Sequence, residues 1–507
     1  MSATTNPTEF IESIQSSYKP KGSFLHLGAG MLENETFGDA AVKIPLRSFN
    51  RHGLIAGATG TGKTKTLQII SEQLALQGVP VLMMDMKGDL SGIAAEGQAN
   101  DKINERHAWL KIPYQQKAFP VELMNLSEEG GVQMRATVSE FGPVLLSRIL
   151  DVTETQAGIL SILFKYCDDH KMPLVDIKDL KEVINFALNE GRADFEVEYG
   201  SMSKASTGAI LRKLVAIEQQ GGDLFFGEPS FDPQDLLRKT TDGIGYCNIL
   251  RLTDIQDKPA LFSTFMLSLL AEIYSSFPEE GDSDKPKLVI FIDEAHLIFK
   301  EASKALLSQL ESIVKLIRSK GVGLFFVTQN PTDVPESVLS QLGLKVQHAL
   351  RAFTAKDRKA IKLAAENFPI SDFYNTANEL TTLGIGEAFV TGLDDKGRPT
   401  ALVKTMLRAP MSRMDVLSKD EVNSINSSSA LVAKYKNAYD SRSAHEILKE
   451  KIEQATQEEV VQKNKKERRA AQPTSRRSST RMHPVVKVLT SATFIRGVMG
   501  ILGKLTK

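Results

Sequence analysis

One stretch constrains the fold of this chain more than any other, because it matches the pattern G-x-x-x-x-G-K-[ST] in full. It reads Gly57-Ala58-Thr59-Gly60-Thr61-Gly62-Lys63-Thr64. A short apolar run, residues 53–56, precedes it like a strand, and a helical apolar pattern follows it. Glycines let backbone N–H groups wrap a phosphate chain, and the N-terminus of the following helix favours an anion. A glycine-rich turn with a chance Lys-Thr is the alternative, but the context of strand, loop and helix favours a nucleoside triphosphate site.

The chemistry of this motif assigns separate roles to its last two residues. Lys63 carries the positive charge that meets the outer phosphates, and the hydroxyl of Thr64 can bind Mg²⁺. The whole segment 57–64 is therefore predicted to bind the nucleotide, and ATP with Mg²⁺ is the predicted cofactor pair.

The amino-acid composition restricts the kind of partner that the protein can bind and the cellular compartment in which it is expected. Among 507 residues, 62 Lys plus Arg balance 62 Asp plus Glu, so any basic surface for nucleic acid must be local. Cys167 and Cys247 lie far apart and read as reduced, buried thiols of a cytoplasmic protein. The polar first ten residues resemble no signal peptide, and no run of 18 apolar residues predicts a membrane-spanning helix.

A second buried strand is predicted at residues 79–84, and it ends at Asp85. Ligands of open α/β sheets bind outside the carboxyl ends of the strands. Asp85, Lys87 and Asp89 are therefore predicted at the nucleotide edge, with an ordinary charged turn as the alternative.

An acidic pair ends a third apolar run, residues 288–292. Burying two acidic side chains at the end of a strand costs free energy unless they pair with a cation. Asp293 is predicted to orient Mg²⁺, and Glu294 to polarise the water that attacks the γ-phosphate. An ordinary strand end is the alternative.

A further buried strand, residues 322–327, ends in Thr328-Gln329-Asn330-Pro331. Gln329 can hydrogen-bond the attacking water or the γ-phosphate, which predicts a sensor; a simple turn before Pro331 is the alternative.

Alternating strands and helices from Gly53 to about Arg408 predict one doubly wound α/β core. The predicted divisions are a short β-rich N-terminal segment (1–50), a first part of the core (51–124), a helical insertion (125–244), a second part of the core (245–417), a charged helix with a basic linker (418–481) and an apolar C-terminal segment (482–507). Within the second part, residues 383–390 are expected to form a glycine turn and an edge strand. The last segment is expected to dock on a protein partner or lie on a membrane surface.

Four motifs in this order resemble the HerA/FtsK group of RecA-like ATPases, and more closely the bacterial HerA-like helicase C-terminal domain proteins. They are the phosphate loop, residues 85–89 (Asp-Met-Lys-Gly-Asp), residues 290–296 with Asp-Glu-Ala-His, and residues 326–331 with Thr-Gln-Asn-Pro. The segment His348-Ala349-Leu350-Arg351-Ala352-Phe353 adds to the resemblance.

The resemblance implies a RecA-like sheet in which the strand of Gln329 lies between the strands of Gly57 and Asp293. It also implies a hexameric ring that hydrolyses ATP and moves double-stranded DNA. Rings of this kind place an arginine of one subunit against the γ-phosphate of its neighbour, and Arg351 is the best match, with Arg318 and Arg358 in reserve. A salt bridge at a strand end is the alternative for Arg351.

Two other functions remain open from the sequence. An ATP-dependent assembly or scaffold protein would use hydrolysis as a switch and its C-terminal segment for recruitment. A small-molecule kinase would need no oligomer, but it leaves Glu294 and Gln329 without an evident role.

Overall fold

The structure is a computed structural model that describes residues 6–127, 130–253, 255, 258–281, 283–301, 304–439 and 441–470. Close contacts divide the chain into two compact units, Met1–Lys449 and Glu450–Lys507. The first unit contains the phosphate loop and the sheet.

A single sheet of 12 strands organises the first unit, in the order β2-β1-β12-β11-β10-β3-β9-β8-β4-β7-β5-β6. From β10 to β6 all neighbours are parallel, and from β10 to β2 all are antiparallel. The strands are β1 (Phe24–Leu32), β2 (Glu35–Pro45), β3 (Gly53–Ala56), β4 (Val81–Asp85), β5 (Val121–Asn125), β6 (Val132–Gln133), β7 (Cys247–Arg251), β8 (Leu288–Ile292), β9 (Val322–Thr328), β10 (Leu344–Gln347), β11 (Glu387–Thr391) and β12 (Val403–Leu407).

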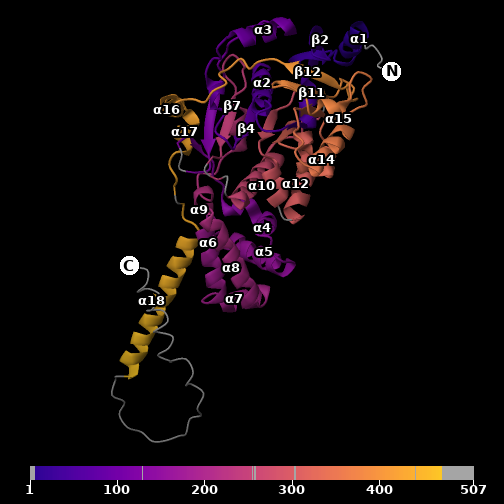
Figure 1. Cartoon of the computed structure of the whole chain (residues 1–507). Helices are drawn as coiled ribbons and strands as arrows, with labels where there is room; N and C mark the ends of the chain where they lie inside the picture. Colours follow the sequence, from indigo (N-terminus) through magenta and orange to yellow (C-terminus); the bar gives the residue numbers. More distant parts are fainter. Residues whose placement is uncertain are drawn as a thin grey trace, which may run out of the picture. The chain divides into compact units, whose positions relative to one another are not determined.

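Helices connect the strands and cover the sheet (Figure 1). They are α1 (Pro7–Ser17), α2 (Lys63–Leu76), α3 (Asp101–Leu110), α4 (Val138–Ile149), α5 (Glu154–Asp169), α6 (Ile177–Leu188), α7 (Arg192–Tyr199), α8 (Lys204–Gln219), α9 (Gly222–Phe225), α10 (Pro259–Ser276), α11 (His296–Glu301), α12 (Lys304–Leu316), α13 (Glu336–Leu339), α14 (Ala355–Glu366), α15 (Thr376–Glu379), α16 (Lys419–Ser428), α17 (Ala430–Tyr435) and α18 (Ala444–Ala470). The predicted α/β class is confirmed.

The central parallel strands are buried along their whole length. Every residue of β3, β4, β8 and β9 is buried, as expected for strands covered on both faces. Their continuous apolar runs were the signal that predicted them. Both cysteines are free and buried, as predicted.

The N-terminal segment does not stand apart from the core, because it completes the sheet. β1 pairs with β12 on one side and with β2 on the other. The prediction of an edge strand near residue 390 is therefore wrong: β11 lies inside the sheet, between β10 and β12. β12 and β1 extend the sheet beyond β11, and β1 lies far from β11 in sequence. The local pattern of residues 383–390 therefore could not show that β11 is an inner strand.

The predicted helical insertion is present between β6 and β7. Helices α4 to α9 pack on one another, and α4 also contacts α10 and α12 of the core. Figure 1 shows them grouped together, below the sheet in that view. Each of α4, α5 and α6 begins with a capping box, at Thr137, Thr153 and Asp176, so short local signals set their first turns.

The chain after the sheet is helical as far as it is described. The start of α18 is fixed on the insertion, since buried Asp179 accepts hydrogen bonds from the Ser443 hydroxyl (2.5 Å) and the His445 N–H (2.8 Å). No helix in the described part of the chain is long and apolar enough to cross a membrane. The apolar segment 482–507, which was predicted to dock on a partner or a membrane, lies outside the described residues. Residues 471–481 of the basic linker also lie outside them.

A buried histidine ties the entry of β3 to its neighbours. His52 Nδ1 accepts the Leu324 N–H of β9 at 3.0 Å, so Nε2 carries the proton and donates to the Val314 carbonyl of α12 at 2.8 Å. Burial lowers the pKa of His52 from 6.5 to about 4, the hydrogen bond to Val314 opposes this, and nearby Arg318 adds to the lowering. The fold therefore holds this ring neutral.

Acid should weaken the fold through His52. Its depressed pKa contributes stability that is complete above about pH 6.5 and is lost as pH falls towards 4, in total roughly 3 kcal/mol. We expect His52→Gln to lower the free energy of unfolding at pH 7.5 by about 1–3 kcal/mol, because the Leu324 N–H loses its acceptor. The variant should lose less stability than the wild type between pH 7.5 and 5. Urea denaturation at both pH values tests this, and equal losses would contradict it.

Candidate nucleotide site

The phosphate loop is held by the ends of the two strands beside β3. The Gly57 N–H donates to Thr328 O at 3.2 Å, and the Ala58 N–H donates to Ala349 O at 2.8 Å. Gly57 has φ 153° and Gly62 has φ 111°, conformations that favour glycine. At Gly57 a Cβ would also lie 2.5 Å from the Cβ of His348. The glycines predicted from the motif are thus required by the backbone itself.

Lys63 begins α2 and is folded back on the loop. Its side chain is 7% exposed, and Nζ donates to Gly57 O at 2.7 Å and to Ala58 O at 3.2 Å. Burial lowers the pKa of Lys63, Lys87 lowers it further, and Glu294 and Asp293 oppose the shift. A phosphate chain in the loop would give this buried ammonium a stronger partner than two carbonyls.

The acid pair lies directly after β8, at the same sheet edge. Asp293 is 7% exposed, and burial together with the neighbouring Glu294 raises its pKa to about 7, against the pull of Lys87. A carboxyl group in this position gains from a nearby cation. The described residues contain no cluster of three acidic, His or Cys side chains that could hold a metal alone. That fits Mg²⁺, which usually takes one or two protein oxygens and completes its shell with phosphates and water. Thr64 and Asp293 would supply the protein oxygens.

Glu294 is constrained through both its backbone and its side chain. Its backbone has φ 49°, a left-handed conformation that is costly for a residue with a Cβ. Its Oε1 lies 2.6 Å from Lys87 Nζ, and its Oε2 accepts the amide of Gln329 and lies 3.2 Å from His296 Nδ1. Both carboxylate oxygens therefore have partners, while the side chain is only 11% exposed.

Strand order brings these groups together. β9 lies between β3 and β8, which is the arrangement that the resemblance implied. In register, Ala56 is opposite Thr328 and Phe326 is opposite Ile292. The residues that follow these strands, namely the phosphate loop, Gln329 and the acid pair, therefore share one edge.

Asp85 ends β4 at the same edge, but its carboxylate faces the backbone. Oδ1 accepts the N–H groups of Lys87, Gly88 and Asp89 at 3.3, 2.7 and 3.1 Å, and Oδ2 accepts that of Leu90 at 3.1 Å. The side chain is buried, and burial raises its pKa. This geometry matches the alternative of a charged turn, and its consequence is to fix the backbone of Lys87.

Arg351 lies beside the phosphate loop of its own chain. It lines an open cleft of about 260 Å³ together with Ala58, Thr59 and Gln329, and it donates to Thr381 O at 3.0 Å. Its predicted role towards a neighbouring subunit stays a prediction. Arg318 lies before β9, at the opposite end of the strand from Gln329, and Arg358 is exposed on α14.

Sequence reasoning placed Lys87 near the nucleotide but missed its partner. β4 and β8 are neighbours in the sheet, and this pairing brings Lys87 to Glu294. The contact between Thr66 Oγ1 of α2 and His348 Nε2, at 2.8 Å, was also missed. The only available signal was the position of each residue after an apolar run, which gives no strand order.

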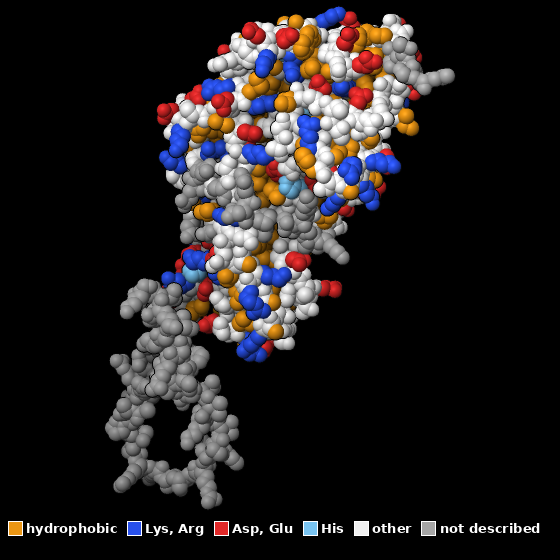
Figure 2. Space-filling model, in the orientation of Figure 1, with side chains coloured by type: hydrophobic (Ala, Val, Ile, Leu, Met, Phe, Trp, Pro, Cys, Tyr) orange, Lys and Arg blue, Asp and Glu red, His pale blue; other side chains and the backbone are white. Residues whose placement is uncertain are grey.

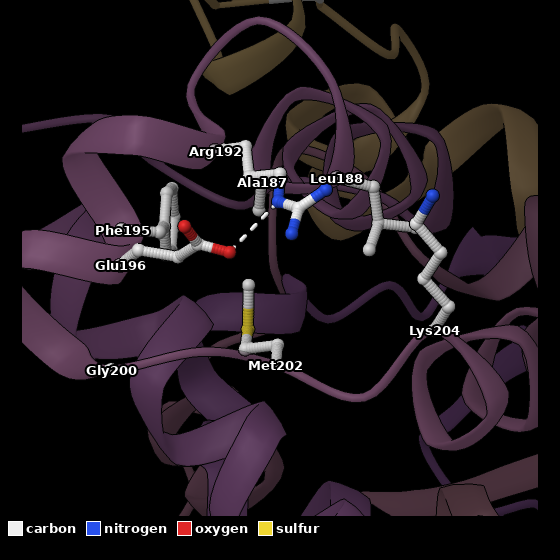
Figure 3. Close-up of a pocket in the computed structure, with 8 residues that line it drawn as sticks. All are labelled: Ala187, Leu188, Arg192, Phe195, Glu196, Gly200, Met202 and Lys204. Atoms are coloured by element: carbon white, nitrogen blue, oxygen red, sulfur yellow. Dashed lines mark hydrogen bonds and ion pairs between the residues drawn. The ribbon is translucent and has the colours of Figure 1, made fainter.

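A second pocket in the helical insertion is too small for a ligand. It holds about 30 Å³, enough for one or two waters. Figure 3 shows the ion pair of Arg192 and Glu196, at 2.8 Å, on its wall, with Phe195 and Met202 facing the same space. This pocket is therefore no competing nucleotide site.

The structural role of Asp85 in its turn can be tested by measuring the stability of the protein. Asp85→Asn replaces one acceptor oxygen by an amide that cannot accept the Leu90 N–H, so we expect the free energy of unfolding to fall by about 1–3 kcal/mol. Asp394→Asn is a matched control, since that carboxylate also accepts turn N–H groups, from Lys396 and Arg398, but lies in a more exposed loop. Urea denaturation should show the smaller loss for Asp394→Asn. The opposite ranking would contradict a structural role for Asp85.

Several known proteins are similar to this chain in sequence. The DNA double-strand break repair helicase HerA of Sulfurisphaera tokodaii is 23% identical over 359 residues, 70% of this chain and 65% of the relative. HerA of Saccharolobus solfataricus is 24% identical, over 75% of this chain and 68% of the relative. A probable HerA of Methanocaldococcus jannaschii is 36% identical, over 68% and 69%. The chain thus spans about two thirds of the length of these curated relatives.

Solved structures show the same fold. The bacterial conjugative coupling protein TrwB superposes with a TM-score of 0.51 at 16% identity, over 80% of this chain and 95% of TrwB. TrwB in complex with the non-hydrolysable ATP analogue ADPNP also gives 0.51, at 15% identity, over 82% and 96%. The predicted RecA-like core is thereby confirmed. The family described as Helicase HerA-like C-terminal matches residues 31–501, and the chain belongs to this family.

Proposed function

We propose that this protein is a ring ATPase that hydrolyses ATP with Mg²⁺ and couples hydrolysis to movement or remodelling of double-stranded DNA. The observation that carries the ATPase assignment is the convergence of Lys63, Gln329 and the pair Asp293 and Glu294 at the ends of three adjacent strands. A kinase or a simple phosphate-binding protein has no need for a buried acid pair beside an amide at this place.

Each group has a defined part in the proposed reaction. Lys63 exchanges its two carbonyl partners for phosphate oxygens. Thr64 and Asp293 would hold Mg²⁺, which would offset the charge of the phosphates. Gln329 positions the attacking water through its side-chain amide, and Glu294 accepts the proton of that water. Lys87 and Gln329 each take up a hydrogen-bonding position on the Glu294 oxygens, so the attacking water must compete with them, and we expect these contacts to rearrange during hydrolysis.

An arginine completes the charge balance at the γ-phosphate. We propose a hexameric ring, from the resemblance to the HerA/FtsK group, in which Arg351 of one subunit approaches the γ-phosphate bound by its neighbour. Arg318 and Arg358 are the reserve candidates for this role. Within its own chain, Arg351 lines the cleft that also contains Ala58 and Thr59.

Duplex DNA is proposed as the partner because the curated relatives are named as DNA helicases and because a local basic surface exists. Helix α14 exposes four basic side chains along its length, and Figure 2 shows Lys and Arg gathered over this region. They are Lys356, Arg358, Lys359 and Lys362. Such a surface attracts a phosphate backbone although the chain carries no net charge.

Two substitutions separate binding from hydrolysis. Lys63→Ala removes the buried ammonium, and we expect it to weaken binding of a fluorescent ATP analogue at least roughly tenfold. Glu294→Gln removes the proton acceptor and should lower the hydrolysis rate roughly 100-fold or more while nucleotide still binds. Phosphate release and fluorescence titration measure the two effects. Hydrolysis at the wild-type rate by the Glu294→Gln protein would refute the assignment of the base.

The DNA partner is tested by salt dependence. We expect duplex DNA to raise the ATPase rate at low salt, and the logarithm of the binding constant to fall linearly with the logarithm of salt concentration. Replacing Lys359 and Lys362 of α14 by Ala should reduce the magnitude of this slope by roughly 2. Replacing exposed Lys165 and Lys171 of the insertion is the matched control. No binding at low salt would exclude DNA, and equal slopes for both variants would remove α14 from the interface.

A further inference from the structure

The ion pair between Lys87 and Glu294 joins the proposed base to a residue from another strand. Lys87 follows β4 and Glu294 follows β8, and these strands are adjacent and parallel. Their charged atoms lie 2.6 Å apart. A lysine at this distance offsets the charge of the carboxylate and competes with a water for the same oxygen. The mechanism proposed above does not account for this residue.

The two partners differ in how freely they can move. The Glu294 side chain is 11% exposed and sits on a strained backbone, whereas the Lys87 side chain is 42% exposed. The Lys87 backbone is fixed by Asp85, so the flexible part is the four-carbon side chain alone. Contact with solvent also makes the pair modest in strength, so a stronger anion can displace Glu294 from the ammonium.

The charge of Lys87, which is held beside Glu294, also acts on two other groups of the site. Burial lowers the pKa of Lys63, and the charge of Lys87 lowers it further. Burial raises the pKa of Asp293, and the charge of Lys87 acts against that rise. Those two residues are the ones predicted to meet the outer phosphates and Mg²⁺. A triphosphate bound by Lys63 would therefore place its terminal phosphate within the range of the Lys87 charge.

We propose that Lys87 is a positioning residue that senses the γ-phosphate: without nucleotide it pairs with Glu294 and keeps the base engaged, and when ATP binds it transfers to the γ-phosphate and frees Glu294. ADP lacks that phosphate, so it leaves the pair intact. This inference rests on the proposed ATPase function and adds a reason why the base is inactive in the empty site.

The proposal is tested by the ratio of affinities for a non-hydrolysable ATP analogue and for ADP, measured by calorimetry with Mg²⁺. Lys87→Met keeps the length of the side chain and removes the charge, so we expect the analogue to bind about tenfold more weakly while ADP binding is unchanged. Lys87→Arg should restore most of the preference, since it retains the charge. Equal weakening for both nucleotides, or none, would overturn the proposal.

Lys287→Met is the matched control. Lys287 precedes β8 at its other end and pairs with Glu280 at 2.8 Å, with side chains 24% and 33% exposed. Losing this ion pair should leave the affinity ratio unchanged. A change as large as that of Lys87→Met would show that the ratio responds to any lost pair, and would overturn the proposal.

A double-mutant cycle adds a readout that a merely structural pair would not move. Glu294→Gln releases Lys87 from its partner, so we expect the ATP analogue, but not ADP, to bind several-fold more tightly than to the wild type. In the Lys87→Met background the same substitution should change neither affinity. Failure of the wild type to bind any nucleotide would refute the ATPase function itself, whereas binding without this coupling would refute only the role of Lys87.

Discussion

The parallel pairing of β3, β9 and β8 is the constraint on which the site depends. Adjacent strands in a sheet lie about 4.8 Å apart, so the three strand ends fall within roughly 10 Å of one another. The registers of Ala56 with Thr328 and of Ile292 with Phe326 align those ends. A lysine, and an amide and two carboxyl groups that follow it more than 200 residues later in the chain, thereby reach one small volume, and the buried apolar strands hold them there.

This arrangement concentrates buried charge. Lys63, Asp293 and Glu294 are all buried, which would be unfavourable for isolated charges. The fold compensates them locally, with loop carbonyls around Lys63 and with Lys87 and Gln329 around Glu294. Burial raises the pKa of Asp293 to about 7, so this carboxyl group would gain from a nearby cation, as its proposed role towards Mg²⁺ requires.

The features that could be predicted from the sequence are those that depend on residues close together in the chain. The phosphate loop, the buried strands and the acid pair each follow from local patterns, and the strand order came from the resemblance to a family and was confirmed. Contacts between distant segments could not be predicted. The pairing of β1 with β12 turned an expected edge strand into an inner one, and Asp85 took up four backbone N–H groups that no motif indicated. The position of Arg351 beside its own loop likewise required the three-dimensional arrangement.

The segment after β4 gains a purpose from these contacts. The buried carboxylate of Asp85 holds the backbone of a turn. From this turn the partly exposed side chain of Lys87 reaches Glu294. A rigid backbone with a mobile charged end is suited to exchange one anion for another, because little of the structure has to reorganise. In the proposed mechanism, control by such an exchange requires no movement of Glu294 itself, whose backbone is strained and whose side chain is buried. The charge of the bound nucleotide would then decide when water meets Glu294.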